Sequence, residues 1–253
     1  MKLGAGALLG VAREVRAGAG DRRPLAVAGA RELVPLLAKA LREGGDPSAV
    51  REGGPPEGAA ALVWLGKADG DVLRRASLAH VPIVGVTEGE SLPYVLDTDL
   101  VVVRPGEALP VERVARRLAA ALGDRGTALA ARLPLLRGPV VDVLVETCAR
   151  RNALVAAAVF APGVDLPVLT LNQVRLVLRI ALAHGREVDR ERLPEVLAVV
   201  GAGFGLRAVA RELLALVPGA GLAAKAAVAY AGTRALGEAA RRRFPAESVR
   251  SGS

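Results

Sequence analysis

The stretch Leu25-Ala26-Val27-Ala28-Gly29, followed at once by Ala30-Arg31-Glu32-Leu33-Val34-Pro35-Leu36-Leu37, decides the fold that the sequence predicts. Its first part is a continuous apolar run, which is typical of a buried parallel strand. Its second part starts a helical pattern of leucines and alanines over residues 31–43 that ends at Gly44-Gly45, a signal for a helix C-terminus. A buried strand that leads directly into a helix predicts the start of a parallel α/β sheet.

The same alternation of strand and helix signals continues to about residue 122. A short strand is expected at Ser48–Arg51, and three clearer strands are expected at Ala60–Leu65, Val81–Val86 and Leu100–Val103. Helices are expected near Asp69–Ala79 and over Pro110–Leu122. Strands that alternate with helices imply right-handed crossovers and a parallel sheet with both faces covered. The sequence therefore predicts a Rossmann-like α/β domain with flanking helices.

Strand signals stop after residue 122, and the rest of the chain has helical periodicity. The expected helices are Gly126–Ala131, Pro139–Arg150, Pro167–His184, Leu193–Val200, Leu206–Leu216 and Leu222–Arg243. The expected breaks are Pro134, Pro139, Pro162-Gly163, Gly185, Gly201–Gly205 and Pro218-Gly219. We therefore predict an N-terminal helix at 1–22, an α/β domain at 23–123, a helical domain at 124–244 and a disordered tail at 245–253. The fold class is α/β plus all-α.

Composition limits the classes of function. The chain is 52% hydrophobic but only 2% aromatic, so its cores must be built from Ala, Val and Leu. Its net charge of +8 favours contact with nucleic acid or an anionic membrane surface, and the arginine-rich composition of a GC-rich genome is the alternative explanation. Nucleic acid is not expected as a partner, because bases stack on aromatic side chains that are scarce here. The single cysteine, Cys148, excludes an internal disulfide and favours a reducing, cytoplasmic location.

Two apolar segments resemble membrane or export signals. Residues 1–12 look like a weak signal peptide, but they run into Arg13, Glu14 and Arg16, which favours a helix with a charged face. The longest charge-free run, 152–164, is shorter than the roughly 20 residues that a spanning helix needs. We therefore expect no ordinary transmembrane helix.

The second half of the chain resembles a bacterial family, the helical domain of unknown function that follows Era-like GTPase domains and occurs in related membrane-associated proteins. The resemblance covers about residues 150–245 and depends on the order of its segments. These are Pro162–Pro167, Leu169–Arg175, Gly201–Gly205, Val217–Gly221 and Ala231–Gly237. In that family the preceding domain is often a GTPase, and the strand order expected here is similar to one.

Three elements that GTP hydrolysis requires are missing from the predicted α/β domain. No G-x-x-x-x-G-K-[ST] phosphate loop follows Gly29, and the one Gly-Lys pair, Gly66-Lys67, is followed by alanine. Asp69-Gly70 lacks the spacing of an Asp-x-x-Gly element. Thr87–Glu90 stands where an Asn-Lys-x-Asp element would read guanine. The sequence therefore predicts a pseudo-GTPase, without catalytic residues and without a cofactor.

Gly29, Ala30 and Arg31 are the candidates for a residual anion site. A helix that starts near Ala30 would direct free N–H groups and the positive end of its dipole at an anion, and Arg31 would reinforce that charge. The alternative is a shortened turn that is kept for packing.

Other chemical motifs do not form a recognisable site. His80 and His184 are isolated from each other and from Cys148, so no metal site is expected. No nucleophile-elbow motif surrounds Ser77 or Ser91. Residues 203–208 fit the dinucleotide pattern G-x-G-x-x-A, but their helical surroundings favour a glycine hinge between packed helices.

Two groups of polar residues are candidates for contact with a membrane or partner. Asn172, Arg175 and Arg179 form a stripe at helical spacing, either a solvated or interdomain face or a functional contact surface. A second group ends the last helix, and it consists of Arg241, Arg242 and Arg243. These arginines either complement the helix dipole and add solubility or touch anionic lipid headgroups.

These observations favour a non-enzymatic scaffold or regulatory module, cytoplasmic and peripheral to the inner face of the membrane. A protein partner or an anionic membrane surface would bind its helical domain, and self-association is compatible with its apolar helices. One alternative is a nucleotide- or anion-responsive switch without a standard phosphate loop. Another is an integral membrane protein with glycine-rich helical hairpins.

Overall fold

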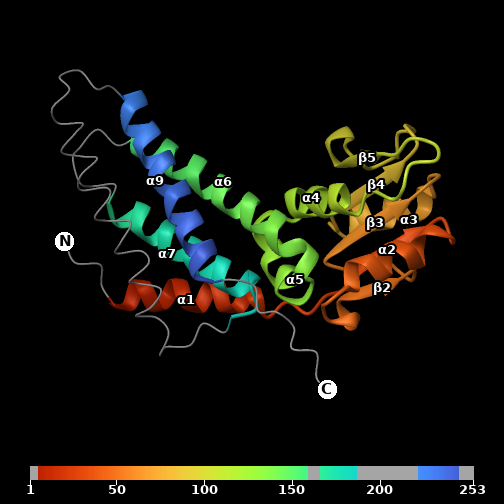
Figure 1. Ribbon diagram of the computed structural model, residues 1–253, viewed down its shortest axis with the longest axis horizontal. Helices are drawn as coiled ribbons and strands as arrows, with labels where there is room; N and C mark the ends of the chain where they lie inside the picture. The colour runs from red at the N-terminus through yellow and green to blue at the C-terminus, as the bar shows by residue number, and fades with distance from the viewer. Residues whose placement is uncertain (1–4, 159–165, 187–221, 245–253) are drawn as a thin grey trace. The chain divides into compact units, whose positions relative to one another are not determined.

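The computed structural model describes residues 5–158, 166–186 and 222–244 (Figure 1). The chain divides into two compact units, which are described separately below. The α/β unit comprises Asp21–Val140. The helical unit combines the residues up to Gly20 with those from Val141 to Glu247. The N-terminal helix, predicted as a segment of its own, therefore packs with the C-terminal helices.

The α/β unit contains the predicted parallel sheet. Its strands are β1 (Leu25–Gly29), β2 (Val50–Glu52), β3 (Ala61–Leu65), β4 (Ile83–Thr87) and β5 (Leu100–Val102). Their spatial order is β2-β1-β3-β4-β5, and every neighbouring pair is parallel. The predicted α/β fold class is thus confirmed. The connections run in one direction from β1 to β2 and in the other from β3 onward, so the order reverses between β1 and β3.

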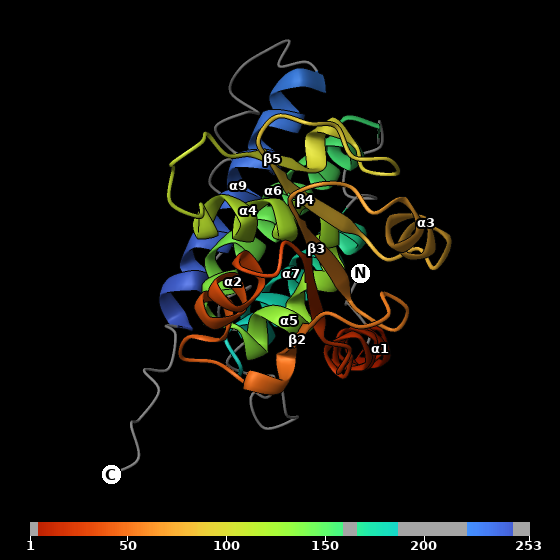
Figure 2. The same cartoon turned by 90° about the vertical axis from the view of Figure 1, so that its right-hand side faces the viewer.

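Helices cover both faces of this sheet (Figure 2). They are α2 (Leu33–Arg42), α3 (Gly70–Leu78) and α4 (Val111–Leu122), and α5 (Gly126–Arg132) packs against α4. Helix α2 packs on β1 and β2, and α4 packs on β4, β5 and α2, so α2 and α4 lie on the same face of the sheet. On the other face Leu73 and Ala76 of α3 pack against Leu62 and Trp64 of β3. Strands β3 and β4 are buried along their whole length, which explains their uninterrupted apolar sequence.

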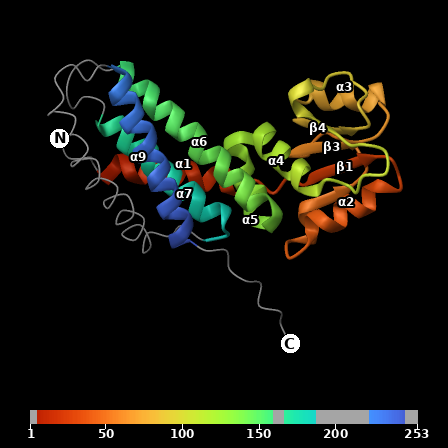
Figure 3. The same cartoon turned by 45° about the horizontal axis from the view of Figure 1, so that its top comes forward.

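The helical unit contains α1 (Ala5–Ala19), the greater part of α6 (Pro134–Ala158), α7 (Leu166–Ala183) and α9 (Leu222–Arg243). Among these, α7 packs against both α1 and α9 (Figure 3). Within the described residues, no helix combines the length and the apolar character that a membrane crossing requires.

The expected break at Pro139 is wrong, because α6 begins at Pro134 and continues through Pro139 to Ala158. A proline inside a helix removes one backbone hydrogen bond and disturbs the preceding turn. Here that cost falls close to the start of the helix, where Leu136 and Val140 are fully buried. Their packing keeps the segment helical across the proline.

Several predictions lie outside the described residues. They include the helices at 193–200 and 206–216, the breaks at 162–163, 201–205 and 218–219, the dinucleotide-like pattern at 203–208 and the tail at 245–253.

Candidate functional site

The strand order identifies where a ligand would bind in the α/β unit. In an open parallel sheet, ligands bind outside the carboxyl ends of the strands, at the point where the order reverses. That point lies between β1 and β3, so the loops after Gly29 and Leu65 form the candidate site. The predicted anion-binding residues Gly29, Ala30 and Arg31 belong to the first of these loops.

The turn after β1 is tight and is tied to β3. Gly29 has a φ of +113°, and a Cβ atom there would lie 2.1 Å from the carbonyl oxygen of Leu65. The N–H of Ala30 donates to that same oxygen at 2.8 Å. The carbonyl of Ala30 in turn accepts hydrogen bonds from the N–H groups of Leu33 and Val34, at 3.0 and 3.1 Å. The chain therefore passes from strand to helix in a compact turn that only glycine permits.

This geometry leaves fewer donors than the sequence predicted. Helix α2 begins at Leu33 rather than near Ala30, because the turn uses Ala30 to bind β3 and to start the helix. The Ala30 N–H is therefore engaged with Leu65. Arg31 is exposed, but it is followed by the exposed carboxylate of Glu32 at the α2 N-cap. An anion here would meet an acidic neighbour beside the arginine, and the anion site stays a prediction.

The loop after β3 contains the Gly66-Lys67 pair. Gly66 has a φ of +82°, and its N–H donates to the carbonyl of Val86 at 2.8 Å. The indole N–H of Trp64 donates to the carbonyl of Lys67 at 2.9 Å, which holds the loop backbone while the lysine itself is exposed. Asp69 then caps α3 by accepting hydrogen bonds from backbone N–H groups. The hydrogen bonds of Gly66, Trp64 and Asp69 therefore stabilise the loop rather than point to a ligand.

The loop after β4 is also bonded to itself. The buried hydroxyl of Thr87 donates to the carbonyl of Glu90 at 2.9 Å and accepts from the N–H of Gly89 at 3.3 Å. The carboxylates of Glu88 and Glu90 belong to exposed residues of the same loop. A phosphate at this edge would therefore face acidic side chains and a hydroxyl that is already engaged.

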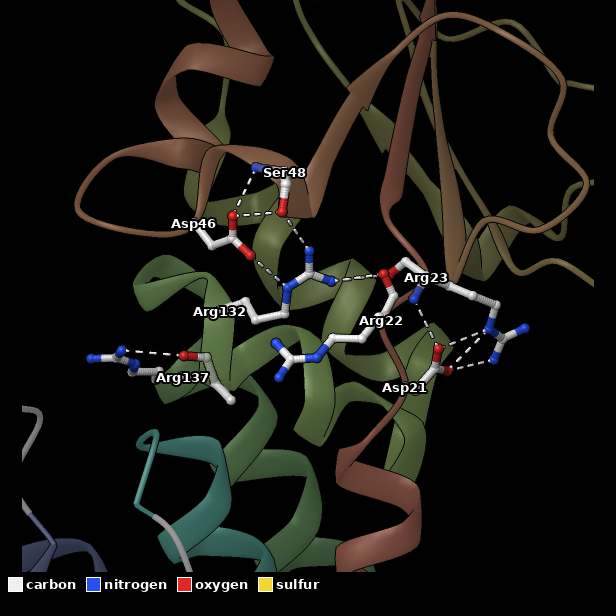
Figure 4. A network of polar contacts seen from close by, with 8 residues as sticks. Asp21, Arg22, Arg23, Asp46, Ser48, Arg132 and Arg137 are labelled. Atoms are coloured by element: carbon white, nitrogen blue, oxygen red, sulfur yellow. Dashed lines mark hydrogen bonds and ion pairs between the residues drawn. The ribbon is translucent and has the colours of Figure 1, made fainter.

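A polar network at the amino ends of the strands has no counterpart in the sequence predictions (Figure 4). Arg132 of α5 donates from Nε to Oδ2 of Asp46 at 2.9 Å, from Nη2 to the Ser48 hydroxyl at 3.2 Å and from Nη1 to the carbonyl of Arg22 at 3.1 Å. The hydrogen bonds from Ser48 and Arg132 lower the pKa of Asp46 to about 2. Because Arg22 and Ser48 precede β1 and β2, the network lies away from the carboxyl ends and joins α5 to the sheet.

The stripe Asn172, Arg175 and Arg179 is directed into the helical unit. The amide of Asn172 donates to Oδ1 of Asn152 on α6 at 2.9 Å. Arg175 binds both carboxylate oxygens of Glu14 on α1, at 2.8 and 3.2 Å, and Arg179 lies 4.0 Å from the same carboxylate. The stripe therefore joins α7 to α1 and α6 within the helical unit, which differs from the predicted solvated or interdomain face. A role as a functional contact surface stays a prediction.

Asn152 is the centre of this interhelical network. Its side chain is fully buried, and its amide donates to the hydroxyl of Thr233 on α9 at 3.0 Å. Thr233 donates to the carbonyl of Ala229, one turn earlier, at 2.7 Å. The three helices α6, α7 and α9 are therefore connected through a single buried amide. Asn152 could not be singled out from the sequence, because one polar residue in an apolar helix does not reveal its partners.

The remaining predicted residues lie at helix ends or make local contacts. Arg241 donates to the carboxylate of Asp142 on α6, whereas Arg242 and Arg243 are exposed at the end of α9. His184 is buried, and its Nδ1 lies 2.8 Å from the carbonyl of Ile180. Within the described residues, no group of three or more His, Cys, Asp or Glu side chains is arranged to hold a metal ion.

Comparison of the sequence with protein-family models and curated proteins, and of the structure with solved structures, yields no match.

Proposed function

We propose that the chain is a non-enzymatic scaffold or regulatory module, built on a GTPase-like α/β unit that does not hydrolyse nucleotide. The observation that carries this proposal is the turn after β1. Gly29 there packs against the backbone of β3, and the N–H of Ala30 is bonded to Leu65. A phosphate loop at the same place would need an open arc of backbone donors, a lysine and a hydroxyl for Mg²⁺.

The electrostatics of the carboxyl edge support the same proposal. Phosphoryl transfer depends on positive groups that surround the transferred phosphate. The loops at this edge carry the cations Arg31 and Lys67, but also the exposed carboxylates Glu32, Glu88 and Glu90. Mixed charge of this kind favours a solvated surface over a phosphate site.

We propose that the helical unit carries the main surface for binding a partner. It exposes apolar side chains on three of its helices, and these are Leu9 on α1, Leu154 on α6 and Val168 on α7. Arg242 and Arg243 are exposed at the end of α9. Apolar surface together with arginines suits either a protein partner or the headgroup region of an anionic membrane.

The absence of catalysis is tested by measuring phosphate release from GTP and ATP with Mg²⁺. We expect no release above the protein-free blank. Release that is lost in Arg31→Ala or Lys67→Ala, but retained in Arg74→Ala on α3, would contradict the proposal. Arg74 is the matched control because it is an exposed cation on a helix that covers one face of the same sheet.

The proposed binding to an anionic membrane is tested by sedimentation with vesicles of neutral lipid and of neutral lipid mixed with phosphatidylserine. Peripheral binding through arginines should require the anionic lipid and should be released by salt, because salt screens exposed charges. Arg242→Gln with Arg243→Gln should weaken that binding, whereas Lys39→Gln with Arg74→Gln removes equal charge elsewhere. Failure to bind either vesicle at low salt would exclude the membrane surface and leave a protein partner as the proposed ligand of the helical unit.

A further inference from the structure

The outer edge of β5 is open. This strand is last in the sheet order, so one of its edges has no neighbouring strand among the described residues. The N–H of Val103 donates to the carbonyl of Thr87 at 2.8 Å, and alternation along a parallel ladder then turns the backbone of Leu100 and Val102 away from β4. Arg113 covers one of these groups by donating to the carbonyl of Val102 at 3.0 Å. The N–H of Leu100 donates to the carbonyl of Asp97. The Leu100 carbonyl and the Val102 N–H remain at the open edge.

Two adjoining grooves follow this edge. One has a volume of about 510 Å³ and is lined by Leu100, Val101, Val102, Arg113, Arg116 and Arg117. The other has a volume of about 690 Å³ and is lined by Val102, Arg104, Pro105, Gly106, Glu107 and Arg113. Because both are lined by Val102 and Arg113, they form one continuous surface along the strand and the loop that follows it. We refer to this surface as the β5 groove.

The β5 groove is strongly basic. Its lining contains Arg104, Arg113, Arg116 and Arg117 but a single carboxylate, Glu107, which pairs with Arg113. Arg116 lies 3.9 Å from Glu112, and both side chains are largely exposed, so that ion pair is weak. Arg117 has no ion-pair partner in the part of the chain that the structure describes. The groove therefore holds guanidinium groups that are available to an incoming carboxylate.

We propose that an acidic, extended segment of a partner protein binds in the β5 groove and adds to the sheet beside β5. This inference depends on the proposed function, for which it names the chemistry of one partner. A peptide supplies both things that the groove lacks, backbone groups for an open strand edge and carboxylates that arginine binds in bidentate fashion. A nucleic acid would supply charge without a strand partner, and the groove lining contains no aromatic side chain for its bases.

The test uses a fluorescein-labelled peptide of alternating valine and glutamate, with fluorescence anisotropy as the readout on the full chain. The variant Arg116→Gln with Arg117→Gln removes two cations of the groove and leaves the Arg113–Glu107 pair in place. We expect its Kd to rise at least about tenfold. The control Lys39→Gln with Arg74→Gln removes the same charge from α2 and α3 and should change Kd less than about twofold, since those residues lie outside the groove.

A second probe tests the strand geometry. The same peptide with alternate amides N-methylated keeps its charge but cannot pair along one edge, and we expect it to bind at least about tenfold more weakly. Equal loss in both double variants would show that net charge alone attracts the peptide. Equal affinity of the methylated peptide, or tighter binding of single-stranded oligothymidylate, would overturn the proposal. Each result leaves the phosphate-release test untouched, so the two proposals fail separately.

Discussion

The two units differ in one kind of buried polar contact, because among the described residues only the helical unit joins two buried polar side chains that are distant in sequence. In the α/β unit the buried polar side chains are Thr87 and Thr127, and each donates to a backbone carbonyl three residues away. In the helical unit the fully buried Asn152 binds Thr233, which is 81 residues distant. A parallel sheet satisfies its backbone through the strand ladder, so its core can be wholly apolar. Helices that are rich in small residues are held in register by side-chain hydrogen bonds across the bundle.

The largest loss of stability is expected from a substitution that disrupts the tight turn between β1 and α2. Gly29→Ala would place a Cβ atom 2.1 Å from a carbonyl oxygen of β3 and force alanine to a φ of +113°. We expect a loss of more than about 3 kcal/mol in the free energy of unfolding, measured by urea denaturation.

The matched control is Gly58→Ala. Gly58 has a φ of +78° but open space around the position of the new atom, so only the backbone strain applies. A loss of about 1 kcal/mol is expected there. Equal losses for the two variants would show that the contact with Leu65 is not what makes Gly29 necessary.

The second prediction sharpens the contrast between distant and local hydrogen bonds. Asn152→Ala removes the buried amide that joins Asn172 and Thr233, and we expect a loss of about 2–3 kcal/mol. Thr127→Ala removes a local bond in the α/β unit and should cost only about 1 kcal/mol. Thermal and urea unfolding of both variants check this order, and the reverse order would contradict the contrast.

The third prediction concerns the close approach of α9 to α6. A Cβ atom at Gly237 would lie 2.5 Å from a methyl group of Val145, whose side chain is stiff in a helix. Gly237→Ala should therefore destabilise by about 1 kcal/mol, even though alanine is the better helix former. Val145→Ala in the same chain should recover part of that loss, measured as a double-mutant cycle. The control Gly10→Ala in α1 has open space around it and should not destabilise; strict additivity of the pair would refute the contact.

The smallest expected effect depends on pH. The pKa of Asp46 is lowered to about 2, so its ionised form stabilises the folded chain above its ordinary pKa of about 3.9, and this contribution is lost as the pH falls toward 2. Because its side chain is 37% exposed, we expect Asp46→Asn to cost less than about 1 kcal/mol at pH 7. The cost should disappear near pH 2. A cost for Asp46→Asn that is constant from pH 2 to pH 7 would exclude the proposed linkage.

The sheet was predictable because its signals are local. Continuous apolar runs predicted β1, β3, β4 and β5, and the alternation with helices predicted parallel pairing, which the register confirms. The place of each strand within the sheet has no such local signal, because it depends on contacts between strands that are distant in sequence.

The candidate site was predictable only in its position. The residues Gly29–Arg31 do lie where the strand order reverses. The hydrogen bond from Ala30 to Leu65 joins the turn after β1 to β3, and neither segment's sequence indicates it. The same limit applies to the Arg132–Asp46 network and to Asn152, whose partners are 86 and 81 residues away. The basic β5 groove was also missed, because its arginines come from two segments, the loop after β5 and α4, that only the fold brings together.

We expect the turn after β1 to bind no nucleotide, and a thermal-shift screen with GTP, GDP and ATP, with and without Mg²⁺, measures this. A ligand at about 100 times its Kd adds roughly 2.7 kcal/mol of stability, and each kcal/mol raises the Tm of a chain of this size by about 2–4 °C. We expect no shift in Tm with any of these nucleotides. A guanine-specific rise in Tm that Arg31→Ala abolishes would contradict it and make the chain a nucleotide-responsive switch.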